Sequence, residues 1–411
     1  MQLRHGRHLA YCTNIHRGES WPEVFANLQT HVLAVRTRVC PDRPYAIGLR
    51  LGDVAARQLA APGALPAFQG WLADHNCYVF TINGFPWGPF HGTRVKEQVY
   101  TPDWTDARRL DYTRLLFDLL VRLLPEGIEG GVSTVPGAFK AALQSAAQVQ
   151  AIVDHLWACV DHLDALRQQT GRVLHLDLEP EPLCFLESTT ETVQFFERLR
   201  QARPGDTRLT DHLRVNYDAC HLAVEFEDPR EALNRLREGG VRIGKFHLSS
   251  ALAVRPAAET VDALRAFADP VYLHQVVARA ADGSLRRFAD LPEALDRSPA
   301  SWATETEWRI HYHIPLHSPP APLWNTTIDH LHGLLDALAE DPGLCPHLEM
   351  ETYTWEILPP GLATRDVVDQ LVGEYRWTLE QLDHRGLGPS PRDGFHPIPG
   401  FREPISSASL G

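Results

Sequence analysis

Short apolar runs recur along the chain and alternate with longer stretches whose apolar residues recur at helical spacing. Eight of these runs predict strands buried on both faces, because most are continuous or nearly continuous in apolar and small residues. They cover residues 8–14, 45–51, 77–83, 130–135, 173–179, 213–218, 241–248 and 347–353. Strands that alternate with helices predict an α/β fold with parallel strands, and eight strands predict a closed (β/α)8 TIM barrel. A doubly wound open sheet is the alternative.

The connection between the seventh and eighth strands is much longer than the others. Within residues 253–317, strand-like runs at 271–277, 285–288 and 308–314 accompany an Asp282-Gly283 turn, which is typical of a hairpin. We therefore predict an antiparallel β insertion that forms a lid over the barrel mouth. Residues 8–385 are expected to form a single TIM-barrel domain that includes this insertion. A Gly/Pro-rich tail follows at 386–411, either disordered or extended across the surface.

Acidic and histidine residues stand at the ends of the last four predicted strands. They are Glu179, Asp218, His247 and Glu351. In a β/α barrel the carboxyl ends of the strands form the active site, so these side chains are expected to converge. Three carboxylates and one imidazole suit a divalent metal (Mn²⁺, Mg²⁺, Zn²⁺, Fe²⁺ or Co²⁺) with positions left open for substrate oxygens. The sequence does not distinguish among these metals.

Two of these ligands have a competitor on the same strand face. Glu181 lies two residues after Glu179; we take Glu179 as the ligand and expect Glu181 to face the rim or a loop arginine. Likewise Glu349 precedes Glu351 by two residues. We take Glu351, which is nearer the strand end, and assign Glu349 to a deeper polar layer.

Further residues near the strand ends are candidates for substrate binding. His221 follows Asp218 by three residues, and its alternative is a hydrogen-bonded loop residue. Lys245 shares a strand face with His247; it either binds a substrate oxyanion or faces the lower barrel.

An HxH pair, His311 and His313, places two imidazoles on one face of a predicted strand. These two histidines are candidates for substrate contact or a second metal, and a polar face of the inserted sheet is the alternative.

Two loops add further candidates for substrate contact. The glycine- and aromatic-rich loop 83–100 predicts a lid that stacks on a ring, and it brings His91, Arg94 and Lys96. Asn14 stands at the end of the first predicted strand.

Composition narrows the partners of the 411-residue chain. Its net charge of −13 disfavours nucleic acid as the main ligand. Seven scattered cysteines fit reduced thiols rather than disulfides. The chain has neither a membrane-spanning apolar run nor the apolar core of a signal peptide. We expect a cytoplasmic protein without membrane insertion that binds a small polyol or sugar-like substrate, and association into a homo-oligomer stays open.

The strand-end pattern resembles the xylose isomerase-like TIM barrel superfamily of sugar phosphate isomerases and epimerases. That group is similar in carrying Glu on strand five, Asp-x-x-His after strand six, His on strand seven and Glu on strand eight. Here these are Glu179, Asp218 with His221, His247 and Glu351. The long insertion departs from ordinary sugar isomerases.

The phrases YCTNIHRGESW, TINGFPWGPFHG, YDACHLAVEFE and KFHLSSAL resemble more closely the E proteins of the bacterial Ebo gene clusters (EboE, "metabolite traffic protein"), over about residues 8–385. This resemblance implies a TIM barrel with a part in making or exporting a small metabolite of secondary metabolism.

Together these observations predict a metal-dependent isomerase or epimerase of a sugar, sugar phosphate or cyclitol. Glu179 and Glu351 are the expected catalytic residues, one removing a proton next to a carbonyl and the other returning it. A metal-dependent hydrolase of a phosphoester and a non-catalytic metabolite-binding protein are the alternatives.

Overall fold

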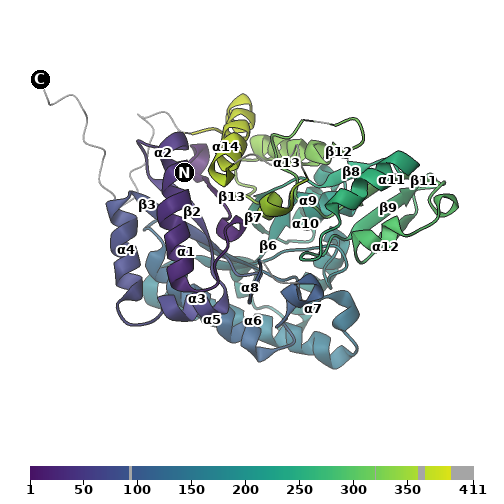
Figure 1. Cartoon of the computed structure of the whole chain (residues 1–411). Helices are drawn as coiled ribbons and strands as arrows, with labels where there is room; N and C mark the ends of the chain where they lie inside the picture. The colour runs from purple at the N-terminus through teal and green to yellow at the C-terminus, as the bar shows by residue number, and fades with distance from the viewer. Residues whose placement is uncertain (92–94, 320, 360–365, 390–411) are drawn as a thin grey trace, which may run out of the picture.

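Eight parallel strands form the centre of the molecule (Figure 1). The computed structural model describes residues 1–91, 95–319, 321–359 and 366–389. The barrel strands are β1 (His8–Tyr11), β2 (Tyr45–Arg50), β3 (Cys77–Asn83), β4 (Gly130–Thr134), β5 (Leu174–Leu178), β6 (Leu213–Asp218), β7 (Ile243–Leu248) and β13 (His347–Met350). Their order is β1-β13-β7-β6-β5-β4-β3-β2, and a parallel bridge between Cys12 and Gly48 joins the two ends. The predicted closed barrel is confirmed, and the open-sheet alternative is not.

Helices surround these strands and bury the apolar stripes that the sequence pattern predicts. They are α1 (Trp21–Asn27), α2 (Leu33–Val39), α3 (Asp53–Leu59), α4 (Ala64–Asp74), α5 (Ala107–Leu123), α6 (Ala146–Thr170), α7 (Thr189–Ala202), α8 (Arg208–His212), α9 (Ala219–Val224), α10 (Pro229–Glu238), α13 (Ile328–Glu340) and α14 (Val367–His384). Local signals set their ends. For example, Ser145 caps the start of α6 by accepting a bond from the Gln148 amide, and Gly171 with φ of 71° ends it.

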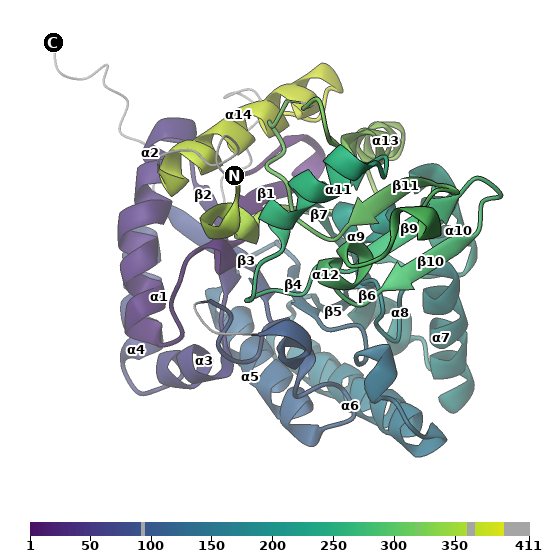
Figure 2. The same ribbon diagram turned by 45° about the vertical axis from the view of Figure 1, so that its right-hand side comes forward.

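A second sheet is inserted between β7 and β13, as predicted. Its strands are β8 (Leu252–Val254), β9 (Val276–Ala280), β10 (Leu285–Phe288), β11 (Glu305–Ile310) and β12 (Asn325–Thr326), with helices α11 (Ala258–Leu264) and α12 (Leu291–Leu295). The order β10-β9-β11-β8-β12 is antiparallel throughout. Figure 2 shows this sheet in green at one side of the barrel, in front of α9 and α10. It has a core of its own, which includes Trp308 and Ile310.

Three element boundaries differ from the expectations in ways that matter for the site. The first strand ends at Tyr11, and a short turn, Thr13–Ile15, carries Asn14. The strand β13 ends at Met350, before Glu351. The strand β11 ends at Ile310, so His311 and His313 lie in the segment after it rather than in a strand.

The start of the predicted tail packs against the N-terminal segment. Leu387 is buried, and the Arg4 amide donates to the Gly388 carbonyl at 3.0 Å. Residues 390–411 of the predicted tail lie outside the described residues. No helix in the described ranges is both long and apolar enough to cross a membrane.

Candidate metal centre

The four residues predicted as metal ligands meet at the carboxyl ends of neighbouring strands. Glu179 follows β5, Asp218 ends β6, His247 lies in β7 and Glu351 follows β13. One donor atom of each lies within 4.8 Å of the others, and all four residues are buried. The Nδ1 atom of His247 lies 3.0 Å from Glu179 Oε1, 3.3 Å from Glu351 Oε2 and 3.4 Å from Asp218 Oδ2. The barrel thus brings together residues spread over more than 170 positions of the chain.

A carboxylate beneath the cluster fixes the orientation of His247. Its Nε2 lies 2.9 Å from Glu349 Oε2, which also accepts a bond from Lys245 Nζ at 2.6 Å. Burial opposes ionisation of Glu349, but Lys245 and His247 outweigh it and lower its pKa to about 2. Because an ionised carboxylate only accepts, Nε2 carries a proton and Nδ1 faces the three carboxylates. Such an arrangement is typical of a histidine that binds a metal through Nδ1.

The cluster holds more negative charge than its own residues neutralise. Burial, aided by Glu179 and Asp218 and opposed by His247, raises the pKa of Glu351 to about 8. Burial disfavours the charged imidazole of His247, yet Glu351 and Glu179 raise its pKa well above the usual value. Among the described residues, Glu179 Oε2 and Asp218 Oδ2 are buried without a hydrogen-bond partner. A divalent cation would bind these unpartnered oxygens and balance their charge, so this oxygen and nitrogen donor set fits a metal.

Two asparagines donate hydrogen bonds to Oε1 of Glu351, its second carboxylate oxygen. Asn14 Nδ2 donates to Glu351 Oε1 at 2.7 Å, and Asn83 Nδ2 donates to the same oxygen at 3.2 Å. Asn14 comes from the turn after β1, and Asn83 is the last residue of β3. Sequence reasoning named Asn14 but missed Asn83, although a polar residue at the end of a predicted barrel strand is a usable signal.

Three histidines form a second cluster beside the first. Their Nδ1 atoms all lie near carbonyl oxygens: His221 at 3.0 Å from Pro180 O, His311 at 2.8 Å from Gln275 Oε1, and His313 at 2.8 Å from Glu351 O. Since a carbonyl oxygen only accepts, each Nδ1 carries a proton. Burial lowers the pKa of His311 and His313, so their Nε2 atoms keep lone pairs, whereas, against the effect of burial, Asp218 and Glu181 raise the pKa of His221.

The three rings lie close together, with 4.5 Å between the ring centroids of His221 and His311 and 5.7 Å between those of His221 and His313. The Nε2 atoms of His311 and His313 are 3.3 Å apart, and His221 Nε2 lies 4.0 Å from Asp218 Oδ2. All are buried. Donor atoms of Asp218, His221 and His313 lie within 4.8 Å of one another, and so do those of Glu181, His221 and His311. Either set, two imidazoles with a carboxylate, fits a second divalent cation.

Glu181 belongs to this second cluster, and the expectation that it faces the rim or a loop arginine is wrong. Its Oε1 accepts bonds from Tyr100 Oη at 2.7 Å and Gln275 Nε2 at 3.2 Å, and lies 3.5 Å from His311 Nδ1. Strand alternation no longer applies after β5, because the chain turns back through a bond from the Glu181 amide to the Leu186 carbonyl. Burial is the main cause that raises the pKa of Glu181 to about 7.

Two predicted substrate-binding residues lie elsewhere. Lys245 is fully buried below the metal cluster, where Nζ donates to Glu349 and, at 2.9 Å, to Ser133 Oγ. The structure therefore favours the alternative in which Lys245 faces the lower barrel. His91 is half-buried outside the cavity lining, and its ring packs against Phe90 with a centroid distance of 4.9 Å. Arg94 lies outside the described residues.

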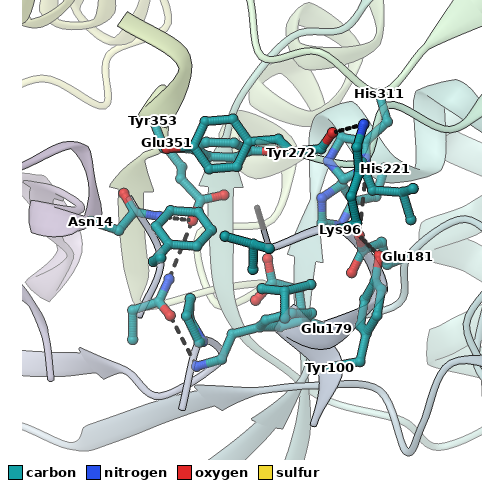
Figure 3. A pocket seen from close by; sticks show the side chains of 17 residues that line it. Asn14, Lys96, Tyr100, Glu179, Glu181, His221, Tyr272, His311, Glu351 and Tyr353 are labelled. Atoms are coloured by element: carbon teal, nitrogen blue, oxygen red, sulfur yellow. Dashed lines mark hydrogen bonds and ion pairs between the residues drawn. The ribbon is translucent and has the colours of Figure 1, made fainter. Parts of the chain in front are cut away.

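Both clusters open into one cavity of about 540 Å³, its opening included (Figure 3). Asn14, His221 and His311 line it, whereas His313 is buried and does not. The insertion supplies His311, Tyr272 and Leu273, so it forms part of the wall, as a lid would. The full lining is Asn14, Asn83, Phe85, Pro86, Phe90, Val95, Lys96, Val99, Tyr100, Glu179, Glu181, His221, Tyr272, Leu273, His311, Glu351 and Tyr353.

Several of these lining residues had no signal in the sequence. Tyr272 and Leu273 lie in the run 271–277, which is predicted as a strand, although β9 begins only at Val276. Irregular backbone has no periodicity from which the direction of a side chain can be inferred.

Comparison with solved structures supports the fold. The chain is similar to a xylose isomerase-like TIM barrel protein from Mycobacterium smegmatis in complex with magnesium, with a TM-score of 0.52, 13% identity, and coverage of 94% of this chain and 99% of that one. It is also similar to an L-ribulose 3-epimerase, with a TM-score of 0.50, 12% identity and coverage of 94% and 96%. No protein-family model and no curated protein sequence matches the chain. At this identity the likeness shows the shared barrel fold alone.

Proposed function

We propose that this protein is a divalent-metal-dependent isomerase or epimerase of a sugar or cyclitol. The observation that carries the proposal is the buried cluster of Glu179, Asp218, His247 and Glu351 at the floor of a cavity. The barrel shared with an epimerase supports it at the level of fold. In line with the resemblance to EboE, we place the activity in the cytoplasm, in the making of a small exported metabolite.

Some residues of the site would be metal ligands, and others position those ligands. Glu179, Asp218, His247 and Glu351 would bind the ion. A bound divalent ion supplies Lewis acidity that polarises a carbonyl and acidifies the neighbouring C–H bond. Glu349 orients His247 from below, and Asn14 and Asn83 orient Glu351 from the side.

Glu179 and Glu351 differ in how their carboxylate oxygens are hydrogen-bonded. Glu179 Oε2 has no hydrogen-bond partner among the described residues, so it can accept a proton from a substrate carbon. Glu351 Oε1 accepts bonds from two amide groups, which fix its direction in the cavity. We assign proton removal to Glu179 and proton return on the other side of the substrate to Glu351.

Isotope exchange tests this proposal. Metal-loaded protein is incubated in D₂O with a panel of ketoses, their phosphates and keto-cyclitols, and deuterium at the carbon next to the carbonyl is followed by NMR. We expect uptake with at least one member, and loss of uptake in Glu179→Gln. Glu374→Gln is the matched control, because it changes another buried glutamate that does not line the cavity. Absence of deuterium uptake with every compound would overturn the proposal.

A metal-dependent phosphoester hydrolase is the second candidate. The observation that favours it is the second cluster, in which two histidines and a carboxylate (Asp218, His221 and His313, or Glu181, His221 and His311) bring donor atoms within 4.8 Å of one another beside the first site. Two ions close together are typical of phosphoester hydrolysis. Elemental analysis of protein purified without chelator discriminates: one ion per chain favours isomerisation, and two favour hydrolysis.

A further inference from the structure

The walls of the cavity above the carboxylates are aromatic. Phe90, Tyr272 and Tyr353 pack edge to face or tilted, with 5.3 Å between each pair of ring centroids. Tyr100 stacks on Phe139 at 5.1 Å and meets Phe85 at 5.9 Å. In Figure 3, Tyr272 and Tyr353 lie on one side of the cavity, and Tyr100 and Glu179 lie on the opposite side. Ring faces of this kind favour the apolar face of a ligand.

The one lysine or arginine in the described lining is not free to bind an anion. Lys96 Nζ donates to Asp290 Oδ2 at 2.6 Å, to the Tyr272 carbonyl at 2.6 Å and to the Asp269 carbonyl at 3.1 Å. An ammonium group has three N–H donors, so these three bonds use all of them.

Three carboxyl groups belong to the same lining. Glu179, Glu181 and Glu351 all face the cavity. A phosphate group placed away from the metal would meet these carboxyl groups, and the described lining has no arginine and no lysine with a free N–H donor to bind it. The cavity therefore disfavours a phosphorylated substrate.

We propose that the substrate is an unphosphorylated ring compound, a cyclic α-hydroxyketone with an apolar face. Its two adjacent oxygens reach the carboxylate floor, and its carbon ring lies between the aromatic walls. This inference rests on the proposed function, because the oxygen pair is bound through the metal that the floor holds. It narrows the choice between sugar phosphates and cyclic compounds that the proposed function leaves open.

Three probes with the same oxygen pair separate these possibilities. Hydroxyacetone carries the pair alone, dihydroxyacetone phosphate adds a phosphate, and 2-hydroxycyclohexanone adds three ring carbons. Binding to the full-length Mn²⁺-loaded protein is measured by calorimetry. Each buried methylene is worth roughly fourfold in affinity, so complete burial of the ring predicts a gain of about 60-fold over hydroxyacetone. We expect 2-hydroxycyclohexanone to bind at least about tenfold more tightly than hydroxyacetone, and dihydroxyacetone phosphate to bind no more tightly than hydroxyacetone.

A variant of the aromatic wall tests whether its rings cause the gain in affinity for 2-hydroxycyclohexanone. Phe90→Ala is expected to reduce the affinity for 2-hydroxycyclohexanone by roughly tenfold while leaving hydroxyacetone and Mn²⁺ binding unchanged. Phe25→Ala is the control, because Phe25 packs against Phe68 and Trp71 in the outer helical layer. Melting temperatures of both variants report whether they fold.

The outcomes are distinguishable. Tighter binding of dihydroxyacetone phosphate than of 2-hydroxycyclohexanone, or equal binding of hydroxyacetone and the ring compound, overturns this inference and leaves the proposed function in place. Failure of all three probes to bind the metal-loaded protein overturns both.

Discussion

Replacing Glu349 by glutamine tests whether the carboxylate below the metal cluster prepares His247 as a ligand. Glu349 Oε2 lies 2.9 Å from His247 Nε2 and 2.6 Å from Lys245 Nζ, and all three residues are fully buried. Loss of such an orienting partner typically costs about 10–100-fold in metal affinity, or about 1.4–2.7 kcal/mol. We expect the Kd for Mn²⁺ to rise by this factor in Glu349→Gln.

The same change also leaves Lys245 without its charge partner. Removing one member of a buried ion pair typically costs about 3–5 kcal/mol of folding stability. A second substitution, Lys245→Met, removes the unpaired charge and is expected to recover most of that loss. It is not expected to restore Mn²⁺ affinity, so the double variant separates the effect on the metal ligand from the effect on folding.

The assay is a competition titration of Mn²⁺ against a chelating indicator, with unfolding in denaturant followed in parallel. Glu374→Gln is the matched control. Its carboxylate is also buried and accepts bonds from Thr352 Oγ1 at 2.7 Å and the Leu316 amide at 3.1 Å, but it does not contact His247. If Glu349→Gln binds Mn²⁺ as tightly as the wild type, Glu349 does not tune the site and the reasoning is refuted.

Three further predictions concern the pH dependence of stability, the second cluster and the hydrogen bond from Asn14 to Glu351. Burial raises the pKa of Glu374 to about 7 from its ordinary 4.5. Folding therefore favours the neutral form, and this stability is full below pH 4.5 and lost as pH rises through 7. Glu374→Gln should gain about 2.5 kcal/mol on the wild type between pH 5 and pH 8 in denaturant unfolding, and an unchanged difference would contradict this. His311→Ala should remove one of two bound ions in elemental analysis while Mn²⁺ binding at the first cluster persists; an unchanged metal content argues against the second site. Asn14→Ala should slow deuterium exchange roughly tenfold or more, because Glu351 loses its 2.7 Å bond, and should weaken Mn²⁺ binding less than Glu349→Gln does, because Asn83 still donates to Glu351; equal exchange rates would show that Asn14 is dispensable.

The sequence by itself determined the barrel and the four residues at its floor. Continuous apolar runs mark strands buried on both faces, and in a parallel barrel every strand delivers its last residues to the same end. That rule places Glu179, Asp218, His247 and Glu351 together without knowledge of a single contact. The Asp282-Gly283 pair also predicts its turn from the sequence alone, because Gly283 adopts a φ of +84°, a backbone conformation that favours glycine.

Only the tertiary structure decided which residues surround that floor. Glu181, Gln275 and His311 come from turns and irregular segments, where no repeating pattern fixes the direction of a side chain. The proton positions on the histidines follow from carbonyl and carboxylate partners far away in the chain, such as Glu349 for His247. Local spacing determines what is near a strand end, whereas the packing of distant segments determines what each side chain meets there.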